Sequence, residues 1–309
     1  MTNSAYAASR IGGTYIAHGE RSVDMLQLTE SQDGQITGVL NTMELSSDGN
    51  IDTHDGSITS GTIDGNQLTL HFSVLAVFGE NIAGTVSGNT IQLESTTNNG
   101  TVQAWDFQRG SLKEFTTYAG QLKAEGQAII FNSKLTNAAQ ELHQMALNAE
   151  AWTTNAKLHA QRIPEVENYY RSLENRMNSL ISRERRTLNG VARNQISVAV
   201  IQANVAGTQA DVQMNQLWDV TIINSGENLA KQFASLPPNC GTPAELQARG
   251  ATQQTTEQWQ NDCQQALSER AKFEPAFESI MKQRAELKSF QAAAQSHRQA
   301  LVKESYRIQ

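Results

Sequence analysis

The hydrophobic pattern of this chain changes period near Gly110 and Ser111, and this change limits the fold more than any other feature. Before it, apolar and polar residues alternate in short segments, and 14 of the 21 glycines lie there. After it, apolar residues recur every three or four positions over long stretches. Alternation indicates half-buried strands, and three-four spacing indicates amphipathic helices. The sequence therefore predicts an α+β chain in two parts: an all-β domain over residues 1–110 and a long-helix domain over residues 111–309.

Turn residues divide the first part into eight candidate strands in hairpin order. The Asp33-Gly34 pair stands between strand-forming runs, and Asp64–Asn66 and Ser87–Asn89 join two further pairs of runs. Such turns between alternating segments are strong short-range hairpin signals. Because a meander of eight strands can satisfy its two edges by closing on itself, we expect an up-and-down antiparallel β-barrel.

The first hairpin also resembles a known family. Gly13–Tyr15, the alternating strand that follows, and Asp33–Gly38 resemble the opening of avidin- and streptavidin-like barrels, and small lipocalin-like barrels share the pattern. The resemblance implies a barrel over residues 11–110, and it concerns fold rather than function. The biotin pocket of that family is walled by several tryptophans, whereas this part has one, Trp105, so biotin binding is not implied.

An eight-stranded barrel can be filled by its own side chains or can hold one small molecule. Ten large residues are expected to point inward: Tyr15, Leu26, Leu28, Leu68, Leu70, Phe72, Ile91, Leu93, Trp105 and Phe107. Their bulk favours a filled core over a cavity. Tyr15 and Trp105 are the candidate residues for binding a ligand or a partner.

The run Ser73–Gly79 breaks the alternation because it is continuously apolar. We favour a buried strand end or a plug of the barrel. The alternative is an apolar loop that offers Leu75 and Phe78 to a protein partner or a membrane surface.

The acidic turn Asp48–Gly56 looks like a calcium loop, but it lacks the glycine and glutamate of the sixth and twelfth EF-hand positions. We therefore predict no metal site.

The second part contains three runs with helical spacing. Ser111 and Glu114 can form a capping box at its start, and Pro164 ends the first run. The second run extends from Glu165 to Phe233, and the third from about Thr252 to Tyr306. Three long helices, with turns near residues 161–165 and 235–251, predict an antiparallel bundle or coiled coil. The candidate kinks of the second helix are Gly190, Gly207 and Gly226, and its apolar seam includes Val191, Val198, Val205 and Val212.

Many seam positions of these helices are alanine, which lets helices approach closely but buries little area per residue. We therefore expect a homo-oligomer through the helices or docking against another protein; the alternative is an independent three-helix bundle. The richest basic run contains Arg183, Arg185 and Arg186. We interpret it as a solvated helix face, with an anionic lipid surface or the acidic barrel of a second copy as alternatives.

Charge is distributed unevenly between the two parts. Residues 1–112 hold 3 Lys and Arg against 12 Asp and Glu, a balance of 3 − 12 = −9, and contain no lysine. Residues 113–309 hold 21 against 19, a balance of +2. An acidic domain repels phosphate backbones, and the basic run lacks interleaved aromatic residues. The sequence therefore disfavours nucleic-acid binding.

The two cysteines, Cys240 and Cys263, are separated by a turn that contains two prolines. The turn can bring them together, so a disulfide in an oxidising compartment and two reduced thiols in the cytosol are both open.

The chain shows no apolar signal peptide at its start, which predicts a cytoplasmic protein, or a periplasmic or secreted one if the sequence has been trimmed. No stretch approaches the roughly 18 apolar residues of a membrane-spanning helix.

No motif for catalysis is visible. None of the six histidines has a metal-ligand partner at the usual spacing, and no nucleophile elbow, P-loop or dinucleotide fingerprint appears. We therefore predict no enzyme and no cofactor. The leading hypothesis is a non-enzymatic binding protein, with a recognition barrel on a helical stalk for assembly or docking, such as a bacterial immunity, inhibitor or adaptor protein. The alternatives are a membrane-acting, toxin-like helical protein and a small-molecule sensor that uses the barrel.

Overall fold

The computed structural model describes residues 11–74, 78–96 and 102–308 of the chain. These residues form two compact units. The first comprises Met1–Leu135 together with Ala244–Gln253, and the second comprises Thr136–Pro243 together with Gln254–Gln309. The strands end at Arg109 and a helix begins at Leu112, whereas the boundary between the compact units falls inside that helix.

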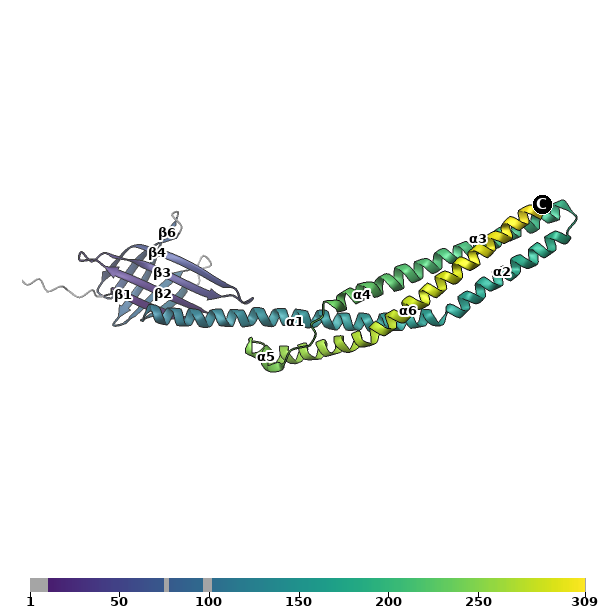
Figure 1. Cartoon of the computed structure of the whole chain (residues 1–309). Helices are drawn as coiled ribbons and strands as arrows, with labels where there is room; N and C mark the ends of the chain where they lie inside the picture. Colours follow the sequence, from purple (N-terminus) through teal and green to yellow (C-terminus); the bar gives the residue numbers. More distant parts are fainter. Residues whose placement is uncertain (1–10, 75–77, 97–101, 309) are drawn as a thin grey trace, which may run out of the picture. The chain divides into compact units, whose positions relative to one another are not determined.

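The first unit contains a closed barrel of eight antiparallel strands, each paired with its neighbour in sequence (Figure 1). The strands are β1 (Gly13–His18), β2 (Ser22–Glu30), β3 (Ile36–Leu45), β4 (Ile51–Asp64), β5 (Gln67–Val74), β6 (Phe78–Ser87), β7 (Thr90–Thr96) and β8 (Val102–Arg109). The pairing of β1 with β8, at Tyr15 opposite Arg109, closes the barrel. The two-part α+β fold expected from the change of period is therefore confirmed.

Strand alternation gives the barrel wall two apolar faces. Leu26, Leu70 and Phe107 belong to the interior cluster. Residues one position away, such as Val23 and Met25, point outward. An outward apolar face on an antiparallel sheet needs a cover, and the helix that follows the barrel supplies it.

Helix α1 (Leu112–Gln161) covers this outer face with its first turns. The side-chain oxygen of Ser111 accepts a hydrogen bond from the backbone nitrogen of Glu114 at 3.3 Å, which is the first half of the expected capping box. Ala119 and Leu122 pack against Ile16 and the strands beside it. These contacts explain why the start of α1 belongs to the same compact unit as the barrel.

The helices after α1 are α2 (Ile163–Arg186), α3 (Gly190–Asn215), the π-helical segment η1 (Gln216–Ile223), α4 (Asn224–Ala234), α5 (Pro243–Ala248) and α6 (Gln253–Ile308). The turn expected near residues 161–165 is not where the chain reverses. Only Arg162 interrupts the helix there, because Pro164 stands in the first turn of α2, where a missing N–H costs nothing. The chain reverses instead at residues 187–189, so that α2 and α3 lie side by side (Figure 1).

The reversal at residues 187–189 divides the second run just before Gly190, one of its three candidate kinks. The side-chain oxygen of Asn189 accepts a hydrogen bond from the backbone nitrogen of Ala192 at 3.0 Å, and α3 begins at Gly190. The other two glycines leave room for neighbours. A Cβ at Gly207 would stand 2.4 Å from Nε of Arg298, and one at Gly226 would stand 2.5 Å from the ring of Phe277. Both glycines therefore permit close packing.

The core of the second unit contains large aromatic side chains. Trp152, Trp218 and Phe273 lie in one buried cluster. The indole nitrogen of Trp152 donates to the carbonyl oxygen of Ile222 at 2.9 Å, and Ile222 lies in the π-helical segment, where the helix ladder is irregular. None of the described helices is both long enough and apolar enough to span a bilayer.

The segment after α4 is linked to α6 through the two cysteines. The sulfur atoms of Cys240 and Cys263 lie 2.05 Å apart, at disulfide distance, with their Cα atoms 5.8 Å apart. Nε1 of Trp259 donates to the carbonyl oxygen of Cys240 at 2.7 Å. Of the two alternatives that the sequence left open, the structure has the paired cysteines.

Candidate functional site

The interior of the barrel is filled at one end and hollow at the other. The filled end holds side chains such as Leu28, Leu68 and Ile91. The hollow lies where β2 begins and β3 ends, and its volume is about 190 Å³. Its lining includes Asp24, Thr42 and Glu44 from β2 and β3, and Ile82, Trp105 and Phe107 from β6 and β8. The prediction of a filled core therefore describes only part of the barrel.

Asp24 is the most unusual group in this hollow. Its side chain is only 5% exposed. One carboxyl oxygen, Oδ1, accepts a hydrogen bond from the hydroxyl of Thr42 at 2.6 Å. No described residue donates a hydrogen bond to the other oxygen, Oδ2. Burial raises the pKa of Asp24; the carboxylate of Glu44 adds to this, whereas Thr42 and His18 oppose it.

The arginines of the barrel do not neutralise Asp24. Arg21 Nη2 donates to the carbonyl oxygen of Ser46 at 2.6 Å. Arg109 Nη2 donates to the carbonyl oxygen of Gly12 at 2.9 Å, and its guanidinium lies 5.4 Å from the ring centre of Tyr15. The described lining of the hollow contains no lysine or arginine. It therefore carries two carboxyl groups without a basic partner.

The residues expected to bind a ligand or partner are found in different places. Trp105 lines the hollow and is half-buried. Tyr15 is buried among the core residues of the barrel, and its hydroxyl donates to the carbonyl oxygen of Ile11 at 3.0 Å. It is not part of the lining. Leu75 lies outside the described residues, and Phe78 begins β6 but its side chain lies outside what the structure describes.

The sequence analysis missed Asp24 and Thr42, because it ranked interior positions by bulk and looked for apolar residues. A usable signal was present. Asp24 occupies the same alternating row as Leu26 and Leu28 on β2, so the alternation places a charged residue on the inward face. A charged residue on an inward row is uncommon and marks a functional or strained position.

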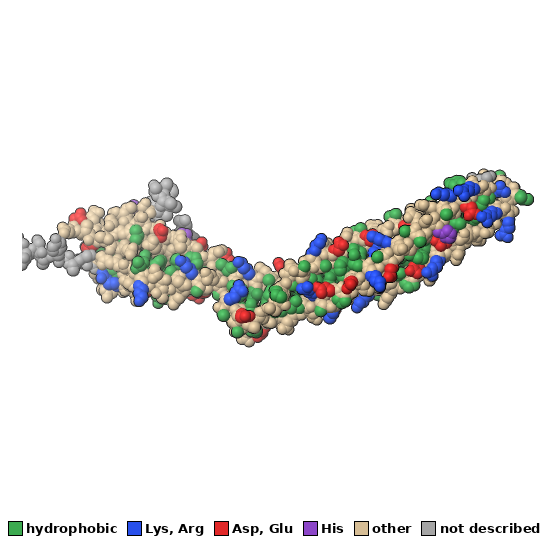
Figure 2. Space-filling model, in the orientation of Figure 1, with side chains coloured by type: hydrophobic (Ala, Val, Ile, Leu, Met, Phe, Trp, Pro, Cys, Tyr) green, Lys and Arg blue, Asp and Glu red, His purple; other side chains and the backbone are tan. Residues whose placement is uncertain are grey.

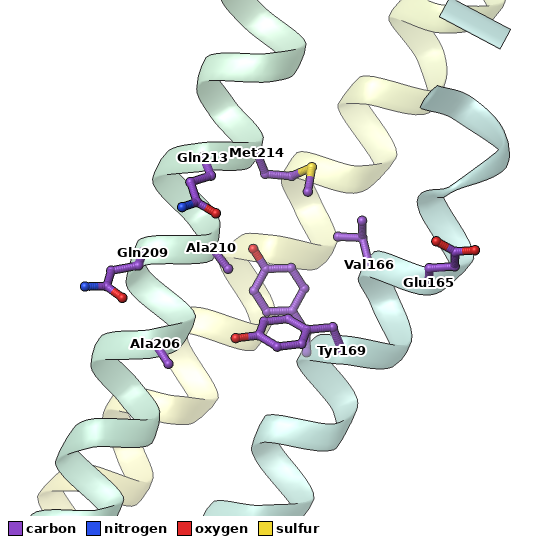
Figure 3. A pocket seen from close by; sticks show the side chains of 9 residues that line it. Glu165, Val166, Tyr169, Ala206, Gln209, Ala210, Gln213 and Met214 are labelled. Carbon is purple, nitrogen blue, oxygen red and sulfur yellow. The ribbon is translucent and has the colours of Figure 1, made fainter. Parts of the chain in front are cut away.

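A second hollow, of about 400 Å³, lies between α2 and α3 in the helical unit. Figure 3 shows Tyr169 and Val166 of α2 facing Ala206 and Ala210 of α3 across it. Glutamines line the α3 side. It carries no buried charge aimed into it, unlike the hollow in the barrel.

Helix α6 places a polar residue at every seventh position of its buried seam: Arg284, Gln291, Arg298 and Ser305. The seam also contains Leu287 and Leu301, so apolar and polar positions alternate at steps of three and four. Arg284 donates to both carboxyl oxygens of Asp219, at 2.8 and 3.0 Å, and to Gln291 at 3.0 Å. These contacts form a polar column inside the bundle.

The column continues to Arg298, whose side chain is 0% exposed. Its Nη2 donates to Oδ2 of Asp211 at 2.6 Å, and its guanidinium lies 5.2 Å from the ring centre of Tyr170. Burial raises the pKa of Tyr170 to about 12, so this phenol stays protonated, and its oxygen accepts a hydrogen bond from Gln291 at 3.2 Å. Arg298 is thus paired with Asp211 through Nη2 alone, because its Nε and Nη1 are buried without a hydrogen-bond partner.

The valines assigned to the apolar seam of the second run are on the surface, which corrects that interpretation. Val191, Val198, Val205 and Val212 are all exposed, and they follow one another at intervals of seven residues on α3. The core side of α3 is formed by other residues, including Ile196 and Val200. The valines form a row along α3, which we call the valine row.

Arg183, Arg185 and Arg186 are exposed in the last turn of α2. Arg185 pairs with Glu304, and Arg186 Nε donates to the carbonyl oxygen of Ser182 at 3.1 Å. Cations at a helix C-terminus are favourable because of the helix dipole. Figure 2 shows Lys and Arg side chains interleaved with Asp and Glu along the visible face of the helices. A role of these arginines in binding stays a prediction.

Within the described residues, no group of three or more His, Cys, Asp or Glu side chains is placed to hold a metal ion. In comparisons with protein-family models, curated proteins and solved structures, nothing matches this chain at a significant level. The functional argument therefore rests on the geometry of the barrel and the helices.

Proposed function

We propose that this chain is a non-enzymatic binding protein whose barrel takes a small molecule in its hollow end. The observation that carries this proposal is the combination of a partly empty barrel interior, a tryptophan in its wall and Asp24, a largely buried residue whose Oδ2 receives no hydrogen bond from the described residues. Binding sites are concave and mostly apolar, with a few polar groups that fix the ligand's orientation. The hollow combines five apolar or aromatic residues with four polar or acidic ones.

The proposal is tested on the full chain with a panel of single-ring compounds that carry positive, negative or no charge. Binding is followed by the fluorescence of Trp105, isolated by subtraction of a Trp105→Phe variant. We expect at least one compound to bind saturably. Leu40→Phe, which fills the hollow, should abolish the signal.

The matched control for Leu40→Phe is Val39→Phe, which adds the same ring on the outward side of the same strand. It should leave binding unchanged. If no compound of the panel binds, or if Leu40→Phe binds as the unchanged chain does, the proposed function fails. A compound that binds in the second hollow, between α2 and α3, would bind equally well to both variants.

We further propose that the helical part assembles with a second copy of the chain through the valine row. β-branched residues at one of the two seam positions of a seven-residue repeat favour a two-stranded coiled coil. Val191, Val198, Val205 and Val212 provide this repeat. Helix α3 carries only two charged residues, Arg193 and Asp211, so two copies of the row would meet without like-charge repulsion.

Sedimentation of the full chain over a range of concentrations tests this second proposal. We expect a dimer, which a Val198→Asp and Val205→Asp double variant converts to a monomer with the same helix content. Exchanging Asn175 and Ser182 for aspartate, at exposed positions of α2 that are also seven residues apart, is the matched control. A monomer at every concentration would contradict the proposal, and the membrane-acting alternative would then be tested by liposome leakage.

A further inference from the structure

We propose that the ligand of the barrel is a small organic cation, an ammonium group on a body of about one six-membered ring, held between Asp24, Glu44 and the ring of Trp105. This inference rests on the proposed function of the barrel and specifies the chemistry of its ligand. It is argued from charge, volume and the nature of the walls.

The hollow of the barrel carries negative charge from two carboxyl groups. Oδ2 of Asp24 receives no hydrogen bond from the described residues, although the side chain is 95% buried, and it lines the hollow. A buried carboxylate without a counter-charge is unfavourable, and an opposite charge within a few ångströms favours its ionised form. Glu44 at the exposed rim adds a second negative charge of the same sign. A cationic ligand supplies the missing counter-charge, whereas an anionic ligand meets repulsion.

Within the described residues, no lysine or arginine lines the hollow. Residues 1–112 contain three arginines and no lysine. Arg21 and Arg109 donate to backbone carbonyl groups, and Arg10 lies outside the described residues. His18 approaches Glu114 at 4.0 Å, and its ring lies against that of Tyr118 of α1 at an angle of 44°.

Volume limits the size of the ligand. A cavity of about 150 Å³ is enough for benzene in a well-studied engineered case. The hollow here measures about 190 Å³, which leaves room for one ring and a short amine-bearing arm.

The wall opposite the carboxyl groups suits the same ligand. Trp105, Phe107 and Ile82 give an apolar surface for the ring. Tryptophan is also the side chain that attracts a cation most strongly through its π face. An ammonium group can therefore be attracted both by the carboxylates and by the indole.

The test is a calorimetric titration of the full chain with three probes of similar shape: benzylamine, benzyl alcohol and benzoate. We expect benzylamine, as its ammonium form, to bind at least tenfold more tightly than benzyl alcohol, and benzoate not to bind. Asp24→Asn, which is nearly isosteric, should remove most of this preference. Glu44→Gln, at an exposed position, should reduce it by a smaller factor and does not endanger folding.

Asp106→Asn is the matched control, because it removes one negative charge from an exposed position next to Trp105 in sequence. It should leave the preference intact. If benzyl alcohol binds as tightly as benzylamine and Leu40→Phe abolishes both, the barrel binds ligands but the inference of a cation is overturned. If none of the probes nor the wider panel binds, the proposed function fails together with the inference.

Discussion

Both compact units bury charged side chains, but the buried arginines of the helical unit are paired with carboxylates, whereas Asp24 of the barrel is not paired with an arginine or lysine. In the barrel, Asp24 is buried with one hydroxyl donor and no cation. In the helical unit, Arg298 and Arg284 are buried, and each is paired with an aspartate. Glu184 of the same unit is also buried, and its Oε2 accepts a hydrogen bond from the hydroxyl of Ser305, but it does not line the hollow of the barrel as Asp24 does. A buried ion pair specifies how helices pack, whereas a buried unpaired carboxyl weakens the fold that holds it.

The contrast indicates which charges belong to structure and which are kept for binding. Asp211 and Asp219 complete a column whose other members lie on α6. Asp24, in contrast, accepts a hydrogen bond from Thr42 and forms no ion pair with a described lysine or arginine. The pKa of Asp219 is lowered, first by its hydrogen bonds with Arg284, while the pKa of Asp24 is raised by burial.

The largest effect is expected when a paired charge in the helical unit loses its partner. Asp211→Asn leaves Arg298 buried without a counter-charge and should cost about 3–5 kcal/mol of the free energy of unfolding. Chemical denaturation followed by circular dichroism measures it. Replacing Arg298 by methionine as well should restore most of the loss.

Glu304→Gln is the control for Asp211→Asn, because it breaks the exposed Arg185–Glu304 pair and should cost about 1 kcal/mol or less. If Asp211→Asn costs no more than this control, the polar column is not a structural element of the bundle.

The second largest effect is expected from removing the disulfide between Cys240 and Cys263. Both cysteines lie in the helical unit and none in the barrel. Cys240→Ser with Cys263→Ser should lower the stability of the helical unit by about 3 kcal/mol, since a closed loop of this size restricts the unfolded chain. Hydrogen exchange should show faster opening of α6 and no change in β2 and β3. Equal exchange of α6 before and after reduction would contradict the link.

The smallest expected effect is a gain of stability, which we expect from the substitution Asp24→Asn. Because the pKa of Asp24 is raised in the folded state, the folded protein binds the proton more tightly than the unfolded chain does. The stability that this provides is present at low pH and is lost as the pH rises through the folded pKa. Asp24→Asn should therefore stabilise the barrel above the ordinary aspartate pKa, while weakening binding of benzylamine.

Asp219 provides the internal comparison for this pH dependence. Its lowered pKa gives stability above the ordinary aspartate value, which is lost as the pH falls. Hydrogen exchange in β2 and in η1 should thus change in opposite directions with pH. Parallel changes would show that the two carboxyl groups are not treated differently.

The period of the sequence predicted the barrel, its eight strands and the change to helices, because alternation and three-four spacing follow directly from backbone geometry. It misplaced the first helix reversal. Pro164 ends a helix and also suits the first turn of the next one, so its position alone does not say whether the chain turns. The reversal at residues 187–189 has only Asn189 and Gly190 as local signals.

The candidate site was only partly predictable. Trp105 was identified because it is the single tryptophan of the β part. Asp24 was missed because a search for apolar positions treats an inward charge as noise. The valine row was assigned to the core for the complementary reason: seven-residue spacing of valines marks a helix face but does not say what covers it, and α6 fills its seam with Arg284, Gln291 and Arg298 instead.

The most direct test of this account is the carboxyl carbon resonance of Asp24, followed by NMR during a pH titration of the full chain. We predict that Asp24 titrates above the ordinary aspartate pKa of about 3.9, that Asp219 titrates below it, and that saturating benzylamine lowers the pKa of Asp24. An Asp24 that titrates at or below the ordinary value, with or without benzylamine, would contradict the claim that the barrel keeps an unpaired carboxyl group for a cationic ligand.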